Sequence, residues 1–162
     1  MEFLTHQNLE IFYQLLLAAG LGAIIGAERR LAHKTAGMRT FALVSMGACL
    51  FTIISIVAFL DYAGKPGFDP SRIASQIVVG IGFLGAGLII FHDSKVRGLT
   101  TAAGLWVTAA IGMSVGYKLY VVAIFATILT LVIFLALWLF EFRFLSRVPM
   151  QLHESEEAKE EI

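Results

Sequence analysis

The sequence has 162 residues, of which 58% are hydrophobic, and its mean hydropathy is +0.82. A soluble domain of this length cannot bury so much apolar surface in one core, so the composition indicates an integral membrane protein. Twelve basic and twelve acidic residues give no net charge, and no basic segment favours nucleic acid as a partner. We therefore expect an all-α, polytopic membrane helix bundle.

Five apolar segments of the chain are long enough to cross a membrane. A helix needs about 17 to 25 mostly apolar residues to span a hydrocarbon core roughly 30 Å thick. We expect transmembrane helices at Leu9–Ala27, Thr40–Leu60, Ile73–Phe91, Thr101–Gly116 and Leu119–Phe140. The fourth is the shortest and least hydrophobic, so we expect other helices to shield it from lipid. The domains expected are a transmembrane domain at 1–145 and a short acidic cytoplasmic tail at 146–162.

The distribution of Lys and Arg between the short connections predicts the orientation, because cytoplasmic loops carry the excess of these residues. The first connection, the third connection and the C-terminal segment hold Arg29, Arg30, Lys34, Arg39, Lys95, Arg97, Arg143 and Arg147. The opposite side would hold only Lys65, Arg72 and Lys118. We therefore expect the N-terminus outside and the C-terminus in the cytoplasm.

Small residues recur at helical spacing in three of the segments. In the first, Ala18 and two glycines recur every four positions, so another backbone can approach that side closely. In the fourth, one face carries Thr101, Gly104, Thr108 and Gly112, and Trp106 points away from it.

The third segment has small residues on two sides, so we expect neighbours on both sides of it. The glycines expected at helix contacts are Gly22, Gly26, Gly80, Gly82, Gly85, Gly87, Gly104, Gly112 and Gly116. For the third and fourth segments, the alternative is a substrate path lined by exposed backbone. The fifth segment has no glycine and is expected at the lipid boundary.

Polar residues gather near the cytoplasmic ends of the expected helices. The candidate functional cluster comprises Glu28, Arg29, Arg39, Thr40, Gln76, Arg97, Thr100 and Thr101. An Arg–carboxylate pair there would lock the first, second and fourth helices together. The alternative is a set of interfacial ion pairs that only fix the topology. Thr100 is also well placed as the N-cap of the fourth helix.

The middle of every expected span lacks acidic, basic and histidine side chains. A proton-coupled carrier or an all-protein Mg²⁺ cage would usually place carboxylates there. The sequence also has no serine–histidine–acid constellation and no metal-ligand spacing. We therefore expect no enzymatic activity, no cofactor and no metal site.

Three blocks of the sequence carry a resemblance to a known family. They are "GAIIGAERRLAHKTAGMRTFALVSMGA", "DPSRIASQIVVGIGFLGAGLII" and "VRGLTTAAGLWVTAAIGMSVG". In this order they resemble the MgtC/SapB family of bacterial inner-membrane proteins. Thr100 departs from members with Asn at that place, so a role specific to an amide cannot be carried over. Many members continue into a soluble ACT-like domain, so regulation through such a domain is expected to be absent or supplied by another polypeptide.

The resemblance implies a role in adaptation to low Mg²⁺ and in the balance of ATP and phosphate, with virulence in pathogenic members. It implies a regulator that acts through helix contacts with a membrane partner such as ATP synthase. Two alternatives stay open: a small oligomeric channel or transporter for Mg²⁺ or another ion, and a structural subunit of a membrane complex. A homodimer or higher oligomer would fit the two small-residue sides of the third segment.

Overall fold

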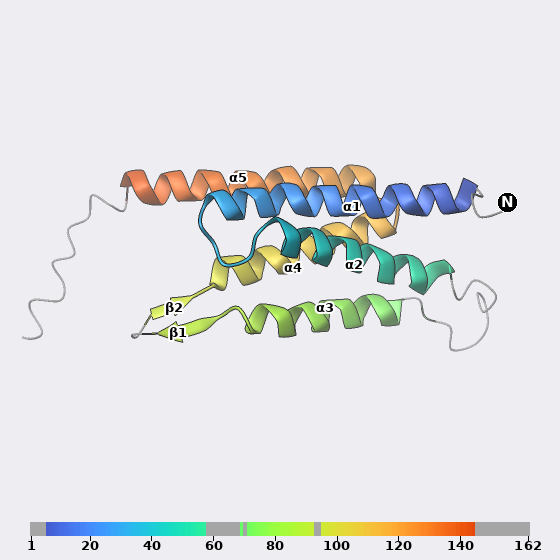
Figure 1. Cartoon of the computed structure of the whole chain (residues 1–162), viewed down its shortest axis with the longest axis horizontal. Coiled ribbons are helices and arrows are strands. Elements are labelled where there is room, and N and C mark those ends of the chain that lie inside the picture. The colour runs from blue at the N-terminus through green and yellow to red at the C-terminus, as the bar shows by residue number, and fades with distance from the viewer. Residues whose placement is uncertain (1–5, 58–68, 70, 93–94, 145–162) are drawn as a thin grey trace, which may run out of the picture. The chain divides into compact units, whose positions relative to one another are not determined.

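The structure is a computed structural model that describes residues 6–57, 69, 71–92 and 95–144. These residues contain five α-helices and one two-stranded antiparallel sheet, which confirms the all-α fold class (Figure 1). By their internal contacts, residues 1–130 and 131–162 form two units. The last helix runs through the boundary, so each unit is described by itself. The expected acidic tail lies outside the described residues.

The first unit holds most of the secondary structure. In chain order its elements are α1 (His6–Leu31), α2 (Met38–Val57), α3 (Ser71–Ala86), β1 (Ile90–His92), β2 (Lys95–Arg97), α4 (Leu99–Gly116) and the beginning of α5 (Tyr120–Phe144). By length and composition, α1, α2, α4 and the segment Tyr120–Leu137 of α5 can each cross a membrane. The expected multi-pass architecture is therefore confirmed.

The third helix is shorter than the sequence predicted. α3 has 16 residues, which is about 24 Å of helix against a hydrocarbon core of roughly 30 Å. It was expected to continue to Phe91, but it ends at Ala86 because the chain tightens into i→i+3 bonds. The Leu88 N–H donates to the Gly85 carbonyl, and the Ile89 N–H donates to the Ala86 carbonyl, both at 3.1 Å.

A β-hairpin follows α3 where the sequence analysis expected only the end of a helix and a loop. β1 pairs with β2, with Phe91 opposite Val96 and Ile90 opposite Arg97. Isoleucine and phenylalanine favour strands, so this apolar run did not distinguish a helix from a strand. The hairpin leads into Gly98, whose φ of 91° lies in the left-handed region that glycine tolerates.

α1, α2 and α4 form a tightly packed three-helix core (Figure 1). The buried face of α1 includes Ala18, Gly22 and Gly26, at the spacing predicted from the sequence. A Cβ atom at Gly22 would overlap the Phe41 carbonyl oxygen of α2. A Cβ atom at Gly112 of α4 would overlap the Ser45 carbonyl oxygen of α2. Glycine is therefore needed at both crossings because backbones touch there.

The predicted faces of α4 are confirmed. Its buried residues include Thr101, Gly104, Thr108 and Gly112, while Trp106 is 52% exposed. Half of the 18 residues of α4 are buried, which is a larger share than in the other candidate membrane spans of the described residues. The helix begins at Leu99 after Gly98, and Gly98 provides no side-chain cap. The expected N-cap at Thr100 is therefore wrong, because Thr100 already lies inside the first turn.

α5 exposes mainly apolar side chains. In the first unit, Ala123, Thr127 and Thr130 are buried, and the two threonine hydroxyls donate to carbonyls four residues earlier in α5. In the second unit, the exposed side chains include Val132, Ile133, Leu135, Leu137 and Leu139. Such a surface suits the lipid boundary that the sequence predicted for this helix.

Candidate functional site

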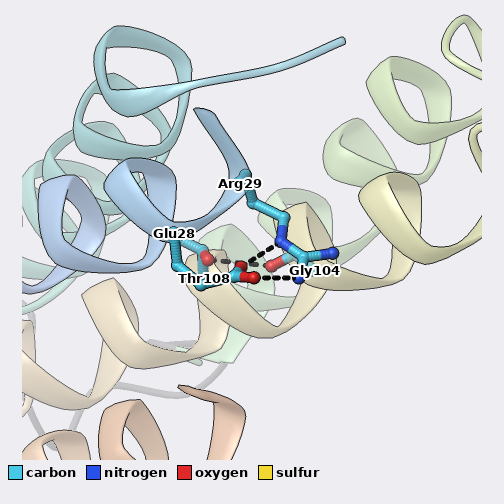
Figure 2. Close-up of polar contacts among 4 residues, drawn as sticks. All are labelled: Glu28, Arg29, Gly104 and Thr108. Atoms are coloured by element: carbon cyan, nitrogen blue, oxygen red, sulfur yellow. Dashed lines mark hydrogen bonds and ion pairs between the residues drawn. The ribbon is translucent and has the colours of Figure 1, made fainter. Parts of the chain in front are cut away.

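An ion pair lies near the end of α1, a helix that packs against α4. The Arg29 guanidinium donates to both carboxylate oxygens of Glu28, and the bond from Nη2 to Oε1 is 2.7 Å long (Figure 2). The Arg29 side chain is only 4% exposed and the Glu28 side chain 12%. Figure 2 shows the pair beside the turn of α4 that contains Gly104 and Thr108. The pair is thus bidentate and largely withdrawn from solvent.

The way α1 ends fixes the backbone around this pair. His33 adopts a left-handed conformation with φ 55°, and the Lys34 N–H donates to the Arg29 carbonyl at 2.9 Å. This Schellman closure satisfies carbonyls that the end of a helix leaves free. A Cβ atom at Gly26 would lie only 2.6 Å from Met38 Cα. The start of α2 is therefore held close against the last turns of α1.

The burial of Glu28 and Arg29 determines what the pair can do. Removing a charge from water is costly, and a partner with well-aligned hydrogen bonds offsets that cost. Each group satisfies the other, so neither is presented as a free charge to a ligand. The Thr108 hydroxyl is likewise satisfied, because it donates to the Gly104 carbonyl at 2.8 Å. The arrangement is a buried ion pair within α1 that lies beside α4 (Figure 2), and we interpret its role as structural.

The other members of the expected cluster are not brought to this pair. Arg39, Thr40, Arg97 and Thr100 are exposed, while Thr101 is buried at the start of α4. Among the described residues, neither Arg39 nor Arg97 forms an ion pair. An Arg–carboxylate clasp across three helices is therefore not found in this part of the chain. Glu28 is bonded instead to the arginine that follows it.

A buried glutamine that the sequence analysis did not single out joins α1 to the end of α4. The Gln14 side chain is 2% exposed, and its Nε2 donates to the carbonyls of Val115 at 2.8 Å and Gly116 at 3.2 Å. The last carbonyls of a helix have no donor within the regular helix. The Val115 carbonyl also accepts from the Lys118 N–H, so the Gln14 amide is a second donor there and supplies a donor to the Gly116 carbonyl. Gln14 precedes Ala18 by four residues on the small-residue face, and that spacing could have identified it.

The predicted packing glycines fall into two groups. Gly22, Gly26, Gly112 and Gly116 meet α2, and a Cβ atom at Gly116 would lie 2.7 Å from Thr52 Cβ. Gly104 is buried in α4. On α3, Gly85 lies in ordinary contact distance of Ala102, at 3.6 Å. A Cβ atom at Gly80 or Gly82 would meet no atom of the described chain within 4 Å. One at Gly87 would meet only carbonyls of the preceding turn, at 3.5 and 3.8 Å. Among the described residues, the small-residue sides of α3 therefore meet a neighbouring helix at Gly85 but not at Gly80 or Gly82.

A groove of about 690 Å³ lies between α2 and α3. Its lining is apolar except for Arg72 and Gln76, which are exposed side chains near the beginning of α3. Gln76, a member of the expected cluster, thus lies far along α3 from the end that leads to β1. In the described residues, no group of three or more His, Cys, Asp or Glu side chains is placed to hold a metal ion.

The fold and these buried polar contacts define a class: a multi-pass helical membrane protein whose helices cross at glycines. Within that class the chain belongs to the MgtC family, whose model matches residues 15–142. The blocks that carried the resemblance in the sequence lie within or overlap that match.

Three relatives illustrate the similarity. The "Putative magnesium transporter YhiD" of Escherichia coli K12 is 46% identical over 126 residues, which are 76% of this chain and 59% of the relative. "Protein MgtC" of Salmonella typhimurium LT2 is 49% identical over 117 residues, 72% of this chain and 48% of the relative. An uncharacterised Haemophilus influenzae protein is 43% identical over 129 residues, 77% of this chain and 54% of the relative.

The chain thus spans about half to three-fifths of the length of these relatives. No solved structure matches it significantly.

Proposed function

We propose that this chain is a non-enzymatic membrane regulator that acts through helix contacts with another membrane protein. The observation that supports this most directly is the outward face of α3, defined here as Ser75, Val79, Gly82 and Ala86. All four residues are exposed. Their spacing of four, three and four residues places them on one side of the helix.

This outward face is separate from the surface that attaches α3 to the rest of the unit. The buried residues of α3 are Ala74, Ile81 and Gly85, which lie on a different side. Because a Cβ atom at Gly82 would meet no atom of the described residues within 4 Å, the backbone there offers room for a neighbouring helix. In lipid, where apolar surface alone gives no drive to associate, small residues are what allow two helix backbones to approach closely.

The physiological role that we propose follows from membership of the MgtC family. It is adaptation to low Mg²⁺ and control of ATP and phosphate balance, with a role in virulence where the host cell is a pathogen. The membrane ATP synthase is the partner that we propose, and a homodimer or higher oligomer formed through the same face is the alternative.

The location that we propose is the bacterial inner membrane, with the N-terminus outside. Exposed basic residues at the end with the hairpin support this orientation: Arg30, Lys34, Arg39, Lys95 and Arg97. Reporter fusions at the two chain ends test it. A C-terminal fusion that is active only outside the cytoplasm contradicts it.

Growth at limiting Mg²⁺ tests the regulatory role. In cells that lack their own copy, Gly82→Leu should reach the membrane at the wild-type level but fail to restore growth, because leucine keeps the partner away. Val132→Leu, a change of modest size on α5, should restore growth and serves as the control. Normal growth with Gly82→Leu at a normal membrane level contradicts the proposal.

Ion transport is the second candidate function, and the name of the E. coli relative is the observation that favours it. Purified protein in liposomes, loaded with a Mg²⁺-sensitive dye, separates the two. The regulatory proposal expects no saturable Mg²⁺ flux above that of protein-free liposomes. A saturable flux that is lost in Gln76→Leu or Arg97→Gln would favour transport instead.

A further inference from the structure

The groove between α2 and α3 offers a surface that the proposed function does not use. Gly47 of α2 and Gly80 of α3 both line it, and a Cβ atom at either would meet no described atom within 4 Å. Val44 and Ile77 also line it and pack against a small core cluster of Ala48, Ile81 and Ala109. The hollow therefore exists because two glycines leave space above a packed apolar floor.

The size of the groove identifies what kind of molecule fits it. An α-helix with side chains is 10–12 Å wide and rises 1.5 Å per residue, so 690 Å³ would hold only about four to six residues of a helix. The lining of α3 runs from Arg72 to Leu84, a rise of about 18 Å, while one leaflet of a bilayer core is roughly 15 Å thick. The groove is therefore long enough for a single acyl chain and too small to enclose several turns of a helix.

The polar residues at one end of the groove indicate which headgroup the acyl chain would carry. Arg72 lies in the first turn of α3, and Gln76 follows one turn later, so both donors lie at the same end. In the part of the chain that the structure describes, Arg72 forms no ion pair. A guanidinium binds phosphate oxygens well, and its charge complements an anionic headgroup.

We propose that the α2–α3 groove binds one anionic phospholipid, with an acyl chain between Gly47 and Gly80 and the phosphate at Arg72 and Gln76. The site is distinct from the outward face of α3, since Gly82 does not line the groove. A hollow of this volume would enclose fewer than about two turns of a helix from a second copy. The lipid site and the regulatory role can therefore be tested separately.

Native mass spectrometry of the detergent-purified chain tests the proposal, with phosphatidylglycerol and phosphatidylethanolamine added as probes. The wild-type chain should retain one phosphatidylglycerol, about fivefold more strongly than phosphatidylethanolamine, because one net anionic charge meets Arg72. Arg72→Gln should remove that preference, and Arg72→Lys should keep most of it. Gly80→Leu should lose both lipids, because leucine fills the groove.

Gly82→Leu is the matched control, since it places the same side chain on the same helix in equally open space. It should retain phosphatidylglycerol as the wild-type chain does. Arg72→Gln tests the site without changing its volume, so the test does not depend on one variant. Equal retention of phosphatidylglycerol by all variants overturns the proposal. A wild-type dimer that becomes a monomer in Gly80→Leu also overturns it and assigns the groove to a second copy.

Discussion

The glycines of the α1–α2–α4 core and those of α3 lie in opposite surroundings. At Gly22 and Gly112 the neighbouring backbone is so close that a single added carbon would overlap it. At Gly80 and Gly82 the same carbon would meet no described atom within 4 Å. Both regions have the same residue type at helical spacing, but Gly22 and Gly112 close contacts with α2, whereas Gly80 and Gly82 close none with the described residues.

This difference separates two uses of small residues in a membrane. In the core, glycine allows backbones to touch, and the resulting packing supports the helices. On α3, the backbone stays open on two sides, the groove and the outward face. A small residue that meets no described atom leaves room for another molecule, and both proposals therefore concern α3.

The largest expected effect comes from enlarging a core glycine. Gly112→Leu should destabilise the chain by more than about 3 kcal/mol, because the obstacle is the Ser45 backbone, which cannot move aside by changing a rotamer. Gly82→Leu should change stability by less than about 0.5 kcal/mol, since the space around it is open. Yield of monodisperse protein and thermal unfolding in detergent measure both. Similar losses for the two variants would remove the distinction between core and α3.

Breaking the Glu28–Arg29 pair should have the next largest effect. Glu28→Gln removes the carboxylate to which the buried Arg29 guanidinium donates, and the loss of this charge-assisted bond should cost about 1.5–3 kcal/mol. Arg29→Lys keeps the charge but loses the bidentate geometry, so its cost should be smaller. Glu10→Gln is the control, because Glu10 pairs with Lys118 at 2.8 Å on the exposed surface. Equal melting temperatures for Glu28→Gln and Glu10→Gln would contradict a structural role for the pair.

Two glutamines sharpen the comparison at a smaller scale. Gln14→Leu removes the donor to the Val115 and Gly116 carbonyls and should cost about 1–3 kcal/mol. Gln76 is exposed and lines the groove between α2 and α3, so Gln76→Leu should leave the unfolding temperature almost unchanged. Denaturant unfolding of both variants measures this. A loss with Gln76→Leu as large as that with Gln14→Leu would mean that the groove is closed in solution.

The smallest expected effect lies at the start of α3. The Ser71 hydroxyl and N–H donate to Asp69, and these bonds hold the pKa of the Asp69 carboxyl below its ordinary value. A lowered pKa in the folded state means that the contact stabilises the helix start above the ordinary Asp pKa of about 3.9. That stabilisation is lost as the pH falls through the folded pKa.

Hydrogen exchange detects this change without a change in global stability. After correction for intrinsic rates, exchange at the Ser71 amide should speed up below pH 4, while amides of the α1–α2–α4 core stay protected. Asp69→Ala should show the fast rate at every pH. A Ser71 amide that exchanges at the same corrected rate in both proteins at pH 7 would contradict the contact.

Sequence periodicity predicted the parts of this fold that depend on one helix at a time. Thr101, Gly104, Thr108 and Gly112 share a face because of helical spacing alone, and their burial followed. The sequence could not predict that Gly112 contacts another helix and Gly82 does not. Residue spacing identifies a helix face made of small residues, but it does not show whether another helix covers that face. The hairpin was missed because Ile90 and Phe91 continue an apolar run that suits a helix or a strand.

The candidate site was predicted less well, because it depends on contacts between helices. Glu28 and Arg29 were named, but their pairing with each other needed the geometry of the α1 end. Arg39 and Arg97 were grouped with them only because they were expected on the same face of the membrane, and a shared face does not bring side chains into contact. Gln14 was missed because its role appears only once the end of α4 lies beside it.

Photo-crosslinking from the outward face of α3 tests the central claim most directly. A photoreactive residue at Val79, in cells grown at limiting Mg²⁺, is compared with one at Val132 of α5; these side chains are 65% and 52% exposed. The account predicts a discrete adduct between the Val79 position and another membrane protein, identified by mass spectrometry and absent with Val132. Adducts from Val79 with lipid alone, or with a second copy of this chain alone, would contradict it.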